Sequence, residues 1–376
     1  MDGLTVFFIL FFGIAAVIPA VWAIVGLIQG NTRYWPAVAG TGFAVALLLV
    51  TIIGAAINWG GCPVNGGSSE GAVQCFASGS SDPSCKPDVW KIECGQSVSC
   101  GDPPTALPAH TFCPAGQTTV FEFCEKIQTG GIKQPWATWS DLSFIASGLW
   151  LLWFFHYFPR PGEYGSGTTL ISVTADNPMI MVGWLSVTYG FIVIFMGPPS
   201  QWFHASMKDW GGWFDAMSVV AWLMFNAVYV IFTLAGPMWG NLREYRTLAV
   251  LLIWGGLMIG SGIIAALIPD SRTYLYFAGG GPWGIAEVIY VFVGWRVATV
   301  RYRRTWWLFI INLTVLAITM GIWVFFNPAI KLFTPPAACH TREGFPGHAL
   351  FHILASVATM LTFASFASEQ EKPPSP

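Results

Sequence analysis

The sequence predicts an all-α polytopic membrane protein, with a seven-helix core, two extra transmembrane helices before it and a disulfide-rich outer loop. Apolar residues make up 54% of the 376 residues and charged residues only 10%, whereas a soluble domain carries about 25% charged residues. The mean hydropathy is +0.59, and apolar segments of membrane-spanning length recur along the chain. The formal net charge is -2, and the sequence lacks the basic pattern of a nucleic-acid-binding protein. A nucleic-acid-binding function is therefore excluded.

Residues 1–58 are expected to form the two extra helices. Residues 4–29 are an unbroken apolar segment, and about 20 such residues cross a bilayer. No basic residue precedes this segment and it is long for the apolar part of a signal peptide, so we interpret it as a retained helix. A short hinge leads to a second predicted span at 36–58.

Residues 59–134 differ sharply from the rest of the chain. They are rich in Gly, Pro, Ser and Asp, a composition that hydrocarbon does not accommodate. We therefore expect an extracytoplasmic insertion. It holds seven of the eight cysteines, namely Cys62, Cys75, Cys85, Cys94, Cys100, Cys113 and Cys124.

The cysteines favour disulfides in an oxidising compartment. The eighth, Cys339, falls in the last predicted outer loop, so all eight lie on one side of the membrane. Cys339 must then pair with a cysteine of the insertion, and we choose Cys124 because it lies nearest the core. The pairing of the other six cysteines stays open. The alternative, a zinc ribbon, would need a Cys-x-x-Cys knuckle, which the spacings do not contain.

Residues 135–367 are predicted to form the seven-helix membrane core. A short tail, 368–376, is expected to be disordered and cytoplasmic. The predicted core spans are 138–158, 178–198, 212–235, 246–268, 281–299, 305–326 and 346–367.

The orientation follows from the arginines in the short loops. One set of alternate loops is much richer in arginine, which predicts a cytoplasmic C-terminus and an extracytoplasmic N-terminus and insertion. The arginine-rich loops carry Arg33, Arg160, Arg243, Arg246, Arg296, Arg301, Arg303 and Arg304, against Lys208, Arg272, Lys331 and Arg342 on the other side.

Two distant segments hold the residues suited to chemistry. Ser200 and His204 are four residues apart, and Asp215 follows eleven residues after the histidine. His348 and His352 begin the last span, on one helical face. The topology places all three histidines at the same membrane depth. Three histidines with an open fourth position are typical of a catalytic zinc site.

Simpler interpretations of these residues were also considered. A lone histidine at a helix end is usually interfacial, as we expect for His110, His156 and His340. Asp215 can serve only to orient an imidazole, and Ser200 can bond back to its own helix. Ionisable residues within membrane helices are costly, which favours a functional role for the set.

These residues resemble the signature of the superfamily that includes the alkaline ceramidases and the adiponectin/progestin receptors, which are seven-helix membrane proteins, mostly zinc hydrolases. The resemblance covers residues 121–367. All five signature positions are filled, by Ser200, His204, Asp215, His348 and His352.

The resemblance is strongest to the alkaline ceramidases, whose entry segment is similar to Glu122-Phe-Cys-Glu125 and the run from Gln134 to Asp141. It implies a disulfide between Cys124 and Cys339. It also implies a Ca²⁺ site, with Glu122, Glu125 and Asp141 as candidate ligands. However, Ala137 and Gln134 stand where the family has an Asn and an acidic residue, which reduces that ligand set.

The function implied by the resemblance is zinc-dependent cleavage of the amide bond of ceramide-like lipids. His204, His348 and His352 would hold Zn²⁺, Asp215 would move the proton, and Ser200 would donate a hydrogen bond. Two alternatives remain: a receptor-type member of the superfamily, and a non-catalytic accessory subunit that binds membrane partners through the N-terminal helices and the insertion.

Overall fold

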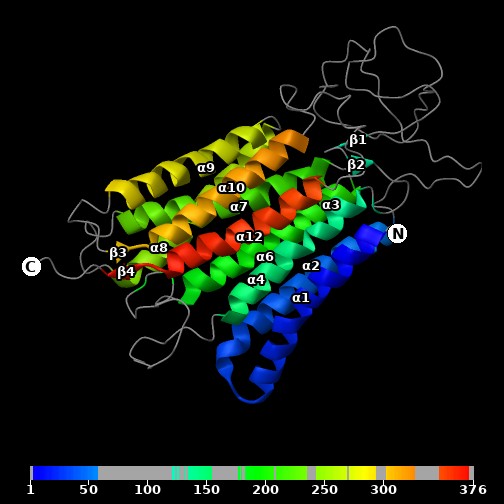
Figure 1. Ribbon diagram of the computed structural model, residues 1–376, viewed down its shortest axis with the longest axis horizontal. Coiled ribbons are helices and arrows are strands. Elements are labelled where there is room, and N and C mark those ends of the chain that lie inside the picture. Colours follow the sequence, from blue (N-terminus) through cyan, green and yellow to red (C-terminus); the bar gives the residue numbers. More distant parts are fainter. Residues whose placement is uncertain are drawn as a thin grey trace, which may run out of the picture.

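The computed structural model describes a bundle of long helices that lie roughly side by side (Figure 1). Helix α1 (Gly3–Ile28) begins at one end of this bundle, and helix α12 (Gly347–Ala367) ends at the other. The described residues are 3–57, 121–122, 125–126, 132, 134–154, 177, 179, 183–206, 209–234, 243–268, 271–293, 302–326 and 347–371.

Six helices of the described chain are long and apolar enough to cross a membrane, so the chain is a multi-pass membrane protein. These are α1 (Gly3–Ile28), α2 (Trp35–Ala56), α7 (Asp209–Leu234), α8 (Arg243–Leu267), α10 (Trp306–Phe326) and α12 (Gly347–Ala367). Large apolar side chains are exposed on the outer faces of α1, α2, α8 and α10. Apolar side chains exposed in this way are suited to contact with lipid tails, which are as apolar as leucine.

The other three predicted spans are also helical. They correspond to α3 (Pro135–Ser140) with α4 (Leu142–Phe154), to α6 (Gly183–Ser206), and to α9 (Ser271–Val288) with the π-helical segment η5 (Ile289–Val293). A short 3-10 helix, η1 (Thr32–Tyr34), joins α1 to α2. The two-residue strands β1 (Phe121–Glu122) and β2 (Glu125–Lys126) pair antiparallel.

The helix boundaries differ most from prediction at α6 and α9. Helix α6 was expected to end at 198, yet it continues through Pro198 and Pro199 to Ser206. Helix α9 was expected to begin at 281, yet it begins at Ser271. Apolar length indicates where a chain crosses a membrane, but it does not fix where a helix begins or ends. Gly279 lets α9 approach Leu223 of α7 closely.

The two N-terminal helices pack against the core of their own chain. Helices α1 and α2 share a buried apolar cluster with α4 and α6. Polar contacts join them too: Trp150 Nε1 donates to the Ala15 carbonyl at 3.0 Å, and Thr51 Oγ1 of α2 donates to Gln201 Oε1 of α6 at 3.2 Å. The inner faces of α1 and α2 therefore pack against the rest of the same chain.

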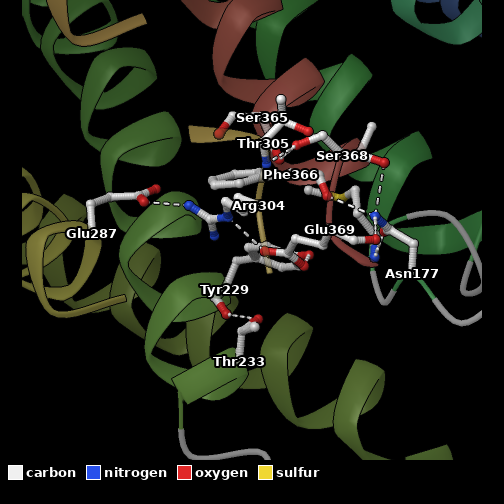
Figure 2. A network of polar contacts seen from close by, with 12 residues as sticks. Asn177, Tyr229, Thr233, Glu287, Arg304, Thr305, Ser365, Phe366, Ser368 and Glu369 are labelled. Carbon is white, nitrogen blue, oxygen red and sulfur yellow. Dashed lines mark hydrogen bonds and ion pairs between the residues drawn. The ribbon is translucent and has the colours of Figure 1, made fainter. Parts of the chain in front are cut away.

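A buried ion cluster lies at the end of the bundle near the C-terminus (Figure 2). The Arg304 guanidinium bridges Glu287 of α9 and Glu369, which follows α12. It also lies over the rings of Tyr290 and Phe366, at 4.2 and 4.5 Å from their centroids. These contacts connect α9, η5, the start of α10 and the end of α12.

The start of the predicted disordered tail is part of this cluster. Ser368 and Glu369 are buried, and β4 (Gln370–Glu371) pairs antiparallel with β3 (Tyr302–Arg303). Asn177 donates to the carbonyls of Phe366 and Glu369 at 2.8 and 3.0 Å. The expectation of disorder from residue 368 was therefore wrong for the first four residues of the tail. Arg304 and Asn177 bind Glu369, the Thr305 N–H donates to Ser368, and residues 370–371 pair with β3.

All eight cysteines lie outside the described residues. The disulfides, including Cys124–Cys339, and the extracytoplasmic insertion stay predictions. The membrane orientation of the termini also stays a prediction.

Candidate metal centre

Three histidines from two distant helices meet inside the bundle. His204 comes from the last turn of α6, and His348 and His352 from the first two turns of α12. All three are buried, and one nitrogen of each lies within 4.8 Å of the others. This meeting was predicted from the sequence, and the cluster can hold a metal ion.

The nitrogen spacing suits shared coordination. Nε2 of His204 lies 3.2 Å from Nε2 of His348. Two nitrogens bound at about 2.0–2.1 Å to one tetrahedral zinc ion would be separated by roughly 3.3 Å. The second nitrogen of His204 is engaged elsewhere, so Nε2 is the one directed at the cluster.

Gln134, at the N-terminus of α3, binds His204 at two points. Its Oε1 lies 2.7 Å from His204 Nδ1, and its backbone N–H donates to the His204 carbonyl at 3.0 Å. The fully buried glutamine side chain thus sets the orientation of the imidazole ring. Partners of this kind orient metal-binding histidines in other proteins.

Three oxygens from the α3 segment surround Nδ1 of His352. Asp141 Oδ1 lies at 2.9 Å, Ser140 Oγ at 3.0 Å and the Ala137 carbonyl at 3.2 Å. Helix α3 ends at Ser140, and the turn at Asp141 precedes α4. The break between these helices therefore brings all three groups to one imidazole nitrogen.

Asp141, one of the predicted calcium ligands, lies at the histidine cluster. Its carboxylate is fully buried and contacts His352. The other two predicted ligands, Glu122 and Glu125, face one another as Cα partners across the β1–β2 pair, and nothing further is described of their side chains. The calcium site therefore stays a prediction.

Ser200 and Asp215 also lie at this site. The Ser200 side chain interacts with the carboxyl groups of both Asp141 and Asp215, and Asp215 interacts electrostatically with His352. Ser200 is buried and Asp215 is partly buried. All five residues singled out in the sequence are thus close together.

Aromatic rings surround the histidines. Phe351 stacks on His348 with ring centroids 5.3 Å apart, Phe203 lies 5.1 Å from His204, and Phe144 lies 6.4 Å from His352. Rings of this size exclude bulk water, which strengthens electrostatic interactions within the site.

The contacts of Gln134 and Asp141 with the histidines were not predicted from the sequence. Both residues had been considered only as calcium positions. The available signal was their location, since a polar and an ionisable residue at the entry to an apolar span are costly and tend to be functional.

The fold and site define a multi-helix membrane protein with a buried three-histidine cluster. No protein-family profile matches the chain, and neither the curated proteins nor the solved structures contain a match. The resemblance to the ceramidase superfamily therefore rests on the residues of the site.

Proposed function

We propose that this protein is a membrane-embedded zinc-dependent hydrolase that cleaves the amide bond of ceramide-like lipids. The observation that carries the proposal is the buried cluster of His204, His348 and His352, with a carboxylate and a hydroxyl beside it. A structural zinc site normally has four protein ligands, whereas a catalytic site has three and an open position.

The donor set fits zinc. Neutral imidazoles suit zinc better than they suit calcium or magnesium, which prefer oxygen ligands. When bound, zinc would act as a Lewis acid and lower the pKa of a bound water to about 7. Asp141 and Asp215 supply negative charge in the same buried site, and both interact with His352.

Asp215 is the proposed general base and acid. It interacts with Ser200 and His352, so its carboxylate can accept the proton of an attacking water and later deliver it to the departing amine. Ser200 has one hydroxyl proton. In this scheme Ser200 donates a hydrogen bond through that proton to the developing oxyanion when the substrate is present.

The surroundings favour a lipid substrate. The histidines lie within the bundle, among Phe144, Phe203 and Phe351. Trp202 and Phe214 pack edge to face nearby, with ring centroids 5.6 Å apart. An amide flanked by acyl and sphingoid chains would match apolar walls of this kind, because its chains need no polar partner.

The test is turnover of a fluorescent ceramide by the purified, zinc-loaded protein in mixed micelles. We expect release of the free fatty acid and sphingoid base by the wild-type protein and none by the zinc-stripped protein. A matched ester lipid tests whether the cleaved bond must be an amide, and a simple fatty amide tests whether the sphingoid chain is required. If a zinc-loaded protein leaves all three substrates intact, the hydrolase proposal is wrong.

A further inference from the structure

We infer that Asp141 is a positioning residue for the metal centre: it orients His352 and compensates the charge of the ion. This inference rests on the metal-binding part of the proposed function and requires no particular substrate. It comes from the contact between Asp141 Oδ1 and His352 Nδ1, at 2.9 Å.

The contacts of Nδ1 define which nitrogen of His352 is available to a metal. The Ala137 carbonyl and the Asp141 carboxylate can only accept hydrogen bonds. The Ser140 hydroxyl donates to the Ala137 carbonyl at 2.8 Å, so it offers only lone pairs to Nδ1. Surrounded by acceptors, Nδ1 carries the proton, and Nε2 is left with its lone pair for a metal.

Asp141 is the charged member of this set. A carboxylate in contact with the protonated nitrogen of a ligating imidazole raises the basicity of the other nitrogen and strengthens its bond to the metal. The three imidazoles are neutral, so a divalent ion would place two uncompensated positive charges in a buried site. Such burial is costly, and Asp141 with Asp215 supplies two negative charges close by.

His204 offers an internal comparison. Its Nδ1 is held by the neutral Oε1 of Gln134 at 2.7 Å, which fixes the ring without adding charge. The site thus contains one imidazole with a neutral partner and one with an anionic partner. The charge on Asp141 is what distinguishes the two, and it can be removed without altering the shape of the side chain.

The experiment measures Zn²⁺ affinity by chelator competition in the purified full-length protein, for the wild type, Asp141→Ala and Asp141→Asn. Ser147→Ala is the control, since it removes a buried polar group further along the same helix, α4. We expect Asp141→Ala to lose about 10- to 100-fold in affinity, the usual effect of removing such a partner. Asp141→Asn keeps an acceptor oxygen and loses the charge, so its loss should fall near the lower end of that range.

Two further measurements separate positioning from general stability. The melting temperature of the zinc-free variants reports the fold, and the visible spectrum of the Co²⁺-loaded variants reports ligand geometry. We expect an altered Co²⁺ spectrum in Asp141→Ala and a spectrum like that of the wild type in Ser147→Ala. If Asp141→Ala does not fold, the affinity of Asp141→Asn decides.

The outcomes distinguish this inference from the hydrolase proposal. Unchanged Zn²⁺ affinity in both Asp141 variants overturns the inference, whatever the activity. Weakened affinity in the variants, with no amide hydrolysis by the wild type, supports the inference and refutes the hydrolase. A wild-type protein that fails to bind Zn²⁺ refutes both.

Discussion

Gly197 packs directly against the backbone of Asp141: a methyl group on this glycine would lie 2.8 Å from the Asp141 carbonyl oxygen. The two residues belong to two different segments of the candidate site, since Gly197 precedes Ser200 on α6 and Asp141 precedes α4. The absence of a side chain at this glycine therefore allows α6 to lie close enough for Ser200 to reach Asp141.

Gly197→Ala should destabilise the protein by about 1–3 kcal/mol, the usual cost of overpacking, because the alanine methyl meets backbone that cannot rotate away. Gly255→Ala is the matched control, since a methyl there has no neighbour within 4 Å. Alanine is favoured over glycine in a helix by roughly 0.5–1 kcal/mol, so the control should be neutral or stabilised. Thermal unfolding in one detergent compares them, and equal melting temperatures would contradict the packing argument.

His348→Ala should abolish both zinc retention and hydrolysis, because two histidines leave the ion without its third protein ligand. Zinc per chain is measured by elemental analysis after dialysis. Ser356→Ala is the control: this residue is buried one turn beyond His352, and its hydroxyl donates to the Ile353 carbonyl of the same helix. A fully active, zinc-free His348→Ala protein would refute the scheme.

Gln134→Ala should weaken zinc binding by roughly 10-fold, because His204 loses the acceptor that orients its ring. Gln134→Glu retains an oxygen at the same position and adds negative charge, so its zinc affinity should equal or exceed that of the wild type. Chelator competition measures both. Equal losses of zinc affinity in the two variants would show that Gln134 does not act by accepting a hydrogen bond from His204 Nδ1.

Asp215→Asn should lower the turnover number by about 10²- to 10⁴-fold, the usual contribution of a general base, while zinc content stays near that of the wild type. The substitution preserves shape and removes the ability to accept a proton. Single-turnover hydrolysis and elemental analysis on the same preparation test both statements. Loss of zinc together with activity would instead mark Asp215 as a residue needed for metal binding.

Arg304→Met should destabilise the protein by about 3–5 kcal/mol, because Glu287 and Glu369 would remain buried without their shared cation. Burial by itself lowers the pKa of Arg304, but the two carboxylates raise it by more than burial lowers it. The pKa of Arg304 therefore lies above its usual range. The cation should therefore persist at every pH at which the protein is folded. The triple variant Arg304→Met, Glu287→Gln, Glu369→Gln, which removes all three charges, should recover part of the loss in urea or thermal unfolding.

Most of the architecture could be predicted from the sequence, because hydrophobic length alone identifies a membrane helix. Each predicted span coincides with a helix. The errors concern the helix ends, which apolar length does not fix. Helix α6 continues through Pro198 and Pro199 beyond the predicted span, and α9 begins ten residues before its predicted span.

The three histidines of the candidate site were predicted from residue type and topology rather than from hydrophobic length. Histidines are rare in a mostly apolar chain, and the predicted alternation of the spans places His204, His348 and His352 at the same membrane depth. These three residues could therefore be grouped from the sequence, and the structure brings them together. The partners of these histidines could not be assigned in the same way. Whether Asp141 contacts His352 depends on the break between α3 and α4, and its spacing along the chain does not reveal that contact.

Helix α12 has an anchor at each end. His348 and His352 stand in its first turns, and Glu369, bound to Arg304, follows its last. Its 21 residues rise about 1.5 Å each, which places the anchors roughly 30 Å apart, about the thickness of the hydrocarbon layer. The helix cannot slide along its axis without moving the histidines away from His204 or Glu369 away from its guanidinium partner. The axial register of the histidines is thereby tied to a salt bridge at the opposite surface of the membrane.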